Sequence, residues 1–128
     1  MKFKNNRDKE LFFSLHLALI MIYADVSLYA KDTYGIDLVI TETITTPDED
    51  LALNRVSDSH QKGISLDFRT KDIPDNIIED IVDYINNNPA YEEYHYLSGS
   101  GVYRLAYHHN NGNGDHCHLQ IHQRFSNK

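Results

Sequence analysis

The chain has 128 residues, 41% of them hydrophobic, and a formal net charge of −7. This size predicts a single domain that buries a core of its own without disulfides or a structural metal. The only cysteine, Cys117, excludes a disulfide framework and a cysteine-rich zinc finger, and the acidic charge argues against binding of nucleic acid or of an anionic membrane surface.

The N-terminal quarter of the chain is predicted to be mainly helical. Residues 1–8 are polar, and we expect them to be flexible. Residues 9–33 are predicted to form one long helix, because apolar residues recur at three- and four-residue steps and make one apolar face. Gly35 follows, where a helix is expected to end.

The apolar segment 11–30 is the only candidate for a targeting signal. His16 and Asp25 interrupt it, so it lacks the uncharged run of about 18 residues that a membrane span requires. The helical pattern also continues past it, without a small-residue cleavage site. We therefore expect a buried helix, and synthesis in the cytoplasm without a signal peptide.

The central part is predicted to alternate strands and helices. β-branched residues predict a strand over 36–45, and a threonine–proline start followed by acidic residues predicts a short helix over 46–54. A second strand begins at Gly63. Residues 72–88 are predicted as a second long helix with Asp72 as its N-cap, because isoleucines repeat every four residues.

The last forty residues have a different character. Three strand-like runs cover 91–97, 102–109 and 115–125, and glycine-rich turn sequences separate them at 98–101 and 110–114. This pattern predicts an antiparallel β-meander. The expected fold is a single α+β domain, in which the N-terminal and central helices pack on an antiparallel sheet.

The sequence SDSHQKGISLDFRT places an aspartate inside a strand that otherwise alternates. His60 precedes Gly63, and Asp67 follows four residues later. With a period of two, Asp67 lies on the face opposite the apolar side chains, and Gly63 permits a turn that brings His60 towards that face. The apolar face is made of Ile64, Leu66 and Phe68.

The final strand shows the same alternation with histidines on one face. His116, His118 and His122 occupy even positions, whereas apolar residues occupy the odd positions from Cys117 onward. Cys117 is therefore predicted to be a small buried hydrophobe rather than a metal ligand. Such a row of imidazoles is unusual for a solvated strand, although pairs of exposed histidines are common.

If the two strands are neighbours, His60, Asp67 and His118 converge and can hold one metal ion. Two imidazoles and one carboxylate leave a fourth position open for water, as in catalytic zinc sites, although iron sites use the same set. Asp115 at the start of the strand, or His116 on the same face as His118, could then take a proton from that water.

The other five histidines are interpreted as structural. His16 is expected at the edge of the core, His122 beyond the metal site, and the rest in exposed strands or turns, namely His95, His108 and His109.

Two motifs resemble those of the LAS-type zinc peptidases, the group that contains the D-Ala-D-Ala carboxypeptidases and L-Ala-D-Glu endopeptidases, many of them in phage endolysins. The run from His60 to Asp67 resembles their H-x-x-G-x-A-x-D motif, and the run from Asp115 to His118 resembles their second motif. The order of elements between the motifs is similar too. The resemblance covers roughly residues 14 to 122.

This resemblance implies a role for each matching residue. His60, Asp67 and His118 would bind one Zn²⁺ per chain, Asp115 would be the catalytic carboxylate, and His116 would lie near the substrate. The implied reaction is hydrolysis of a peptide bond in peptidoglycan stem peptides or their precursors. A monomer is expected, with release to the cell wall or incorporation in a virion.

The chain departs from the family at two places. Ser65 stands where alanine is usual, and Ile44 or Thr45 occupies the region where the first strand usually ends in an arginine. Arg55 or Arg69 could serve instead. The missing arginine concerns the part of the site that would bind the substrate rather than the metal site.

Two other classes of function compete with the peptidase. A non-catalytic phage structural or regulatory module could keep the fold and the zinc without the reaction. A His-metal-finger nuclease would use a motif similar to the one ending at His118, but it needs a ligand-bearing helix after the strand, and only ten residues follow.

Overall fold

The computed structural model describes residues 1–109 and 115–126 and has an α+β fold. The main sheet is mixed and has the strand order β1-β2-β3-β7-β6, with β1 parallel to β2 and the other neighbours antiparallel. A separate two-stranded sheet contains β4 and β5. The strands of the main sheet are β1 (Lys2–Phe3), β2 (Val39–Glu42), β3 (Ser65–Arg69), β6 (Ala106–His109) and β7 (His116–Gln120), and those of the small sheet are β4 (Tyr96–Leu97) and β5 (Tyr103–Arg104).

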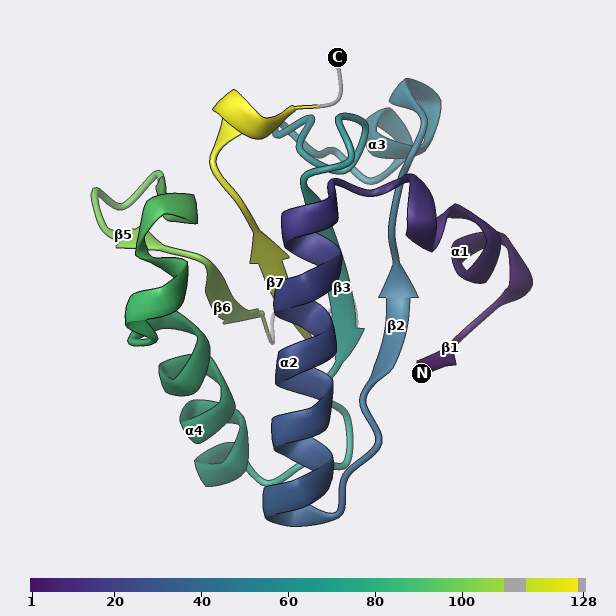
Figure 1. Cartoon of the computed structure of the whole chain (residues 1–128). Coiled ribbons are helices and arrows are strands. Elements are labelled where there is room, and N and C mark those ends of the chain that lie inside the picture. The colour runs from purple at the N-terminus through teal and green to yellow at the C-terminus, as the bar shows by residue number, and fades with distance from the viewer. Residues whose placement is uncertain (110–114, 127–128) are drawn as a thin grey trace.

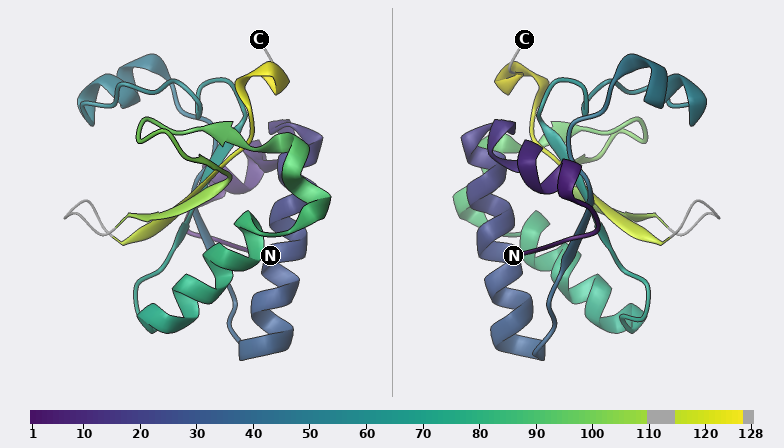
Figure 2. Two further views of the ribbon diagram at one scale, coloured as in Figure 1. Left: turned by 90° about the vertical axis from the view of Figure 1, so that its left-hand side faces the viewer. Right: turned by 90° about the vertical axis from the view of Figure 1, so that its right-hand side faces the viewer.

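The two long helices, α2 and α4, cover one face of the main sheet and leave the other face without a helical layer (Figures 1 and 2). The α-helices are α1 (Asn6–Leu11), α2 (Leu17–Tyr34), α3 (Pro47–Ala52) and α4 (Asp75–Asn86), and the 3-10 helices are η1 (Phe12–Ser14), η2 (Pro89–Tyr94) and η3 (Gln123–Phe125). No helix in the described ranges is long and apolar enough to cross a membrane.

The core lies between the sheet and these two helices. The predicted alternation of β3 is confirmed, because Leu66 and Phe68 are buried and the ring of Phe68 packs 5.9 Å from that of Tyr23 in α2. Cys117 of β7 is fully buried on the same side, as predicted. Burial raises the pKa of its thiol, so the side chain is inert at neutral pH. The alternation thus assigns one face of each strand to the core and leaves the other face to polar side chains.

The prediction of one helix over 9–33 is wrong in one respect, because the chain breaks at Leu15 and His16. Leu15 is extended, and the His16 imidazole accepts a hydrogen bond of 3.0 Å from the amide of Ala18, which caps α2. The amide of His16 donates to the carbonyl of Gly63 at 2.9 Å. This break therefore ties the start of α2 to the loop before β3. The helix ends at Gly35 with a φ of 69°, as predicted.

Residues 1–8, which we expected to be flexible, contain β1 and the start of α1. Phe3 pairs with Ile40 of β2 and packs its ring edge-on against Phe12. The buried carboxylate of Asp8 accepts hydrogen bonds of 2.8 and 2.7 Å from the amide and hydroxyl of Thr43. Asp8 is therefore a buried hydrogen-bond acceptor, although a charged residue near the chain start was expected to be exposed.

The remaining predicted elements are found with shifted bounds. Thr46 starts α3 with a capping box, as expected, but β2 is shorter than 36–45. The N-cap of α4 is Pro74 rather than the expected Asp72, which lies two residues earlier with a φ of 68°. The prediction of a three-stranded meander is only partly right, because much of 91–97 forms η2 and the short pair of β4 and β5 leaves the main sheet. The predicted turn over 110–114 lies outside the described residues.

Candidate metal centre

Antiparallel pairing of β3 with β7 brings the two sequence motifs together. Asp67 lies directly opposite His118 in the register of this pair, as the metal hypothesis required. Leu66 and Phe68 anchor β3 in the core, so the side chain of Asp67 points to the face that the long helices leave open. The same argument applies to His118, whose neighbours Cys117 and Leu119 are buried.

His60 completes the group from the loop that precedes β3. The loop turns at Gly63, which has a φ of 71°, and the amide of Gly63 donates to the carbonyl of His60 at 3.2 Å. A positive φ strains any residue with a side chain, which explains the glycine. The turn folds His60 back over Asp67, as predicted from the sequence.

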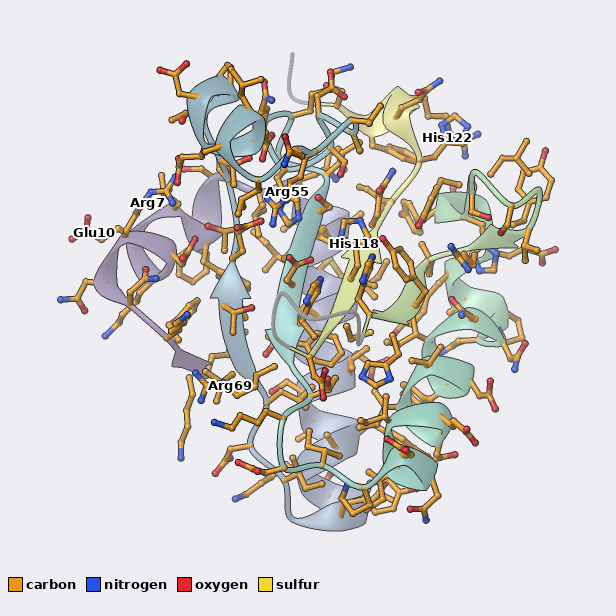
Figure 3. The ribbon with its side chains drawn as sticks, turned by 180° about the vertical axis from the view of Figure 1, so that it is seen from behind. Arg7, Glu10, Arg55, Arg69, His118 and His122 are labelled. Carbon is orange, nitrogen blue, oxygen red and sulfur yellow. The ribbon has the colours of Figure 1, made fainter. Side chains whose placement is uncertain are left out.

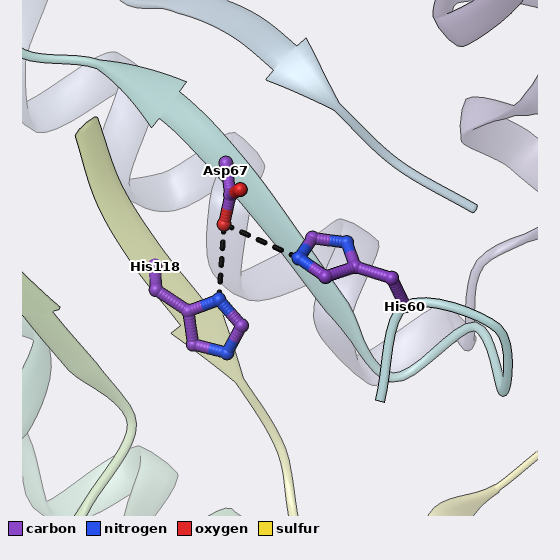
Figure 4. Close-up of side chains that lie close together, drawn as sticks. All are labelled: His60, Asp67 and His118. Carbon is purple, nitrogen blue, oxygen red and sulfur yellow. Dashed lines mark hydrogen bonds and ion pairs between the residues drawn. The ribbon is translucent and has the colours of Figure 1, made fainter. Parts of the chain in front are cut away.

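His60, Asp67 and His118 form a candidate metal-binding triad whose ligand atoms all lie within 4.8 Å of one another (Figure 4). Asp67 Oδ1 lies 2.9 Å from His118 Nδ1 and 3.4 Å from His60 Nε2. All three residues are at most 9% exposed. Two ligands bonded at about 2.0–2.2 Å from a tetrahedral ion lie roughly 3.3 Å apart, so the triad already has nearly the spacing that an ion needs.

The outer nitrogen of each imidazole faces an oxygen that can only accept a hydrogen bond. His60 Nδ1 lies 2.7 Å from the carbonyl of Thr43, and His118 Nε2 lies 2.9 Å from Oε1 of Gln120. With a metal bound, each outer nitrogen would keep its proton, and each inner nitrogen would offer its lone pair to the ion beside Asp67. Two imidazoles oriented in this way around one buried carboxylate make a donor set that fits a metal ion.

The charges within the triad support this conclusion. Burial alone would raise the pKa of Asp67, but hydrogen bonds from His118 and His60 outweigh it and hold that pKa far below its usual range. Burial likewise acts to lower the pKa of His60, but the hydrogen bond and negative charge of Asp67 outweigh it, and the pKa is raised. The site thus favours positive charge beside Asp67.

A cavity of about 650 Å³ opens beside the triad on the open face of the sheet. Arg55 and Val56 line it on the side of the loop after α3, and Ser98 and Arg104 line it on the side of β4 and β5. Figure 3 shows this face, with Arg55 and His118 pointing into the region between the two sides. A ligand of several residues could therefore reach the triad from solvent.

Glu42 is a charged residue of this cavity that the sequence did not indicate. The register of β2 against β3 shifts between Ile40 and Glu42, and this irregularity places Glu42 opposite Asp67. Its carboxylate lies 3.4 Å from His60 Nε2 and forms an ion pair with Arg55. Alternation from the buried Ile40 would place Glu42 on the core face of β2, whereas the register shift places it on the cavity face. The position of Glu42 was therefore not predictable from the sequence.

Arg55, one of the two arginines considered in place of the missing one, lines the cavity. Its guanidinium bonds Glu42, lies 3.1 Å from Asp50 Oδ1 and 4.0 Å from Asp67 Oδ2. Three carboxylates therefore surround it. Arg69, the other alternative, is not among the residues that line the cavity.

The two residues expected to take a proton occupy different environments. His116 lines the cavity, and its Nε2 lies 3.8 Å from Asp67 Oδ2. Asp115 is exposed just before β7 and is not among the lining residues, whereas its backbone carbonyl accepts a hydrogen bond of 3.1 Å from Thr70. The catalytic role of Asp115 therefore stays a prediction.

The other histidines lie mostly outside the triad's surroundings. His16 and His122 cap α2 and η3, and His108 bonds the hydroxyl of Thr70 at 2.9 Å. His109 differs from the prediction, because it lines the cavity and its ring stacks on that of His116 with centroids 5.2 Å apart.

Comparisons of the chain with known protein families, curated proteins and solved structures found no match.

Proposed function

We propose that the protein is a zinc-dependent peptidase that hydrolyses a peptide bond in peptidoglycan stem peptides or their precursors. The observation that carries the proposal is the convergence of His60, Asp67 and His118 beside a cavity, with the outer nitrogen of each imidazole held by an acceptor oxygen. The resemblance of both motifs to the LAS-type peptidases supplies the reaction and the substrate class.

Each residue of the site would have a separate role in binding the metal or in transferring a proton. His60 and His118 offer neutral nitrogens in fixed orientations, and Asp67 supplies the negative charge that favours a cation. Bound zinc would lower the pKa of a water molecule towards neutrality and polarise the carbonyl of a substrate. His116 lies on the cavity wall and can exchange a proton there, whereas Asp115 is proposed only on the match to the second motif.

A non-catalytic module that keeps the metal is the second candidate. The position of Asp115 outside the lining of the cavity favours it, because a catalytic carboxylate must reach the reacting atoms. This candidate shares the triad with the peptidase, so only the reaction separates the two.

A digest of purified muropeptides, analysed by mass spectrometry, tests the proposal. We expect the zinc-loaded protein to release one defined fragment, His118→Ala to be inactive, and the matched variant His122→Ala to stay active because His122 only caps η3. Asp115→Ala should keep the metal, and its activity decides between Asp115 and His116 as the base. A zinc-loaded protein that leaves every stem peptide intact would refute the peptidase and favour the non-catalytic module.

A further inference from the structure

Arg104 is a cation on the cavity wall with no carboxylate partner among the described residues. The other arginine of the cavity, Arg55, already has carboxylates around it. Arg104 therefore has its charge available to a ligand.

The guanidinium of Arg104 lies close to two tyrosines. Tyr96 lies directly opposite Arg104 in the pairing of β4 with β5; burial raises the pKa of the Tyr96 hydroxyl, and the nearby Arg104 acts to lower it. The ring of Tyr107 lies under the guanidinium, with the ring centroid 4.4 Å from Cζ. The Nε atom is buried and has no hydrogen-bond partner in the part of the chain that the structure describes. A guanidinium packed on an aromatic ring in this way loses little conformational entropy when it binds a planar anion.

Tyr107 also connects Arg104 to the triad. Tyr107 is opposite His118 in the pairing of β6 with β7, and the two ring centroids are 5.3 Å apart. The guanidinium is therefore two ring contacts away from a triad residue. The two contacts together cover at most about 10 Å, and an extended peptide advances about 3.3 Å per residue, so up to about three residues span this separation.

We propose that Arg104 binds a carboxylate of the ligand in this cavity, up to about three residues from the group that lies at the triad. A carboxylate fits better than a doubly charged phosphate, because Glu42 and Asp67 line the same cavity and repel excess negative charge. The inference rests on the proposed function only for the class of ligand, which is a stem peptide. Binding of a carboxylate at Arg104 needs no hydrolysis.

The test compares two probes, an acetylated tripeptide of stem-peptide sequence with a free C-terminal carboxylate and the same tripeptide as its C-terminal amide. Titration calorimetry of the metal-free protein in chelator measures binding without turnover. We expect the acid to bind about 10- to 100-fold more tightly than the amide, as for a charge-assisted hydrogen bond to a fixed guanidinium. Arg104→Gln should remove this preference, and Arg104→Lys should restore part of it.

Lys4→Gln is the matched control, because it removes one positive charge from the same cavity without touching the tyrosines. It should keep the preference for the acid. Arg104→Gln should melt at the temperature of the wild type and bind zinc as tightly, which shows that the fold and the triad are intact.

Equal binding of acid and amide, binding of neither, or a preference that survives Arg104→Gln would overturn the inference. Its failure is distinguishable from that of the proposed function. Hydrolysis of stem peptides with no preference for the acid would refute the role of Arg104 alone. A preference for the acid that depends on Arg104, in a protein that hydrolyses nothing, would refute the peptidase alone.

Discussion

Asp67→Asn tests the triad with the smallest change in shape. The amide has nearly the same size as the carboxylate, but it lacks the charge that faces His118 at 2.9 Å and His60 at 3.4 Å. An ion held by two imidazoles and a neutral amide is bound much more weakly than one held by a carboxylate. The variant should therefore keep the fold and lose most of its affinity for zinc.

The expected size of the effect follows from linkage. Free metal at 100 times its dissociation constant stabilises a folded protein by about 2.7 kcal/mol. An unfolding entropy of about 2.1 cal/mol/K per residue gives roughly 0.27 kcal/mol/K for a chain of this length. Zinc should therefore raise the melting temperature of the wild type by about 10 °C and that of Asp67→Asn by much less.

Thermal melting of metal-free protein, with and without added zinc, measures this difference. Asp58→Asn is the matched control, because Asp58 is exposed and pairs only with Lys62 among the ion pairs of the described residues. It should show the full wild-type shift. An Asp67→Asn variant that shows the full shift as well would place the metal elsewhere, and a wild type without any shift would refute the metal site.

Two further predictions concern the same site. Without metal, the free energy of unfolding should fall as pH rises above about 6.5 and through the raised pKa of His60, because protonated His60 beside Asp67 is lost there. With zinc, the free energy of unfolding should instead rise with pH, because the metal needs neutral imidazole. Urea midpoints measured between about pH 6 and 8 should therefore have opposite slopes in chelator and in zinc. Slopes of the same sign would contradict this. Gln120→Leu should weaken zinc binding by about 10- to 100-fold, because it removes the hydrogen-bond partner of the outer nitrogen of His118. Chelator competition measures the affinity, and Gln123→Leu, at an exposed position, is the control. Equal affinities of the two variants would show that Gln120 does not orient the ring.

The triad was predictable because it depends on local alternation and one strand pairing. Leu66 and Phe68 fix the face of Asp67, the apolar odd positions around Cys117 fix the face of His118, and Gly63 marks the turn. These signals are short-range and strong, so the residues of the site could be named from the sequence.

Other parts of the cavity depend on contacts that no local pattern contains. Glu42 reaches the site through a register shift in β2, and Arg104 reaches it because β4 and β5 leave the main sheet. Both depend on how distant segments pair. Gln120 is different, since it shares the face of His118 two residues away, and the alternation could have identified it.

The contact between Asp8 and Thr43 has a consequence for the whole molecule. Asp8 of α1 holds the amide and hydroxyl of Thr43, and the carbonyl of Thr43 in turn orients His60. If the triad binds a metal, docking of α1 and occupation of the triad would be two coupled equilibria, and linkage is reciprocal. Metal binding would then strengthen the docking of the N-terminal segment by the same factor by which that docking strengthens metal binding.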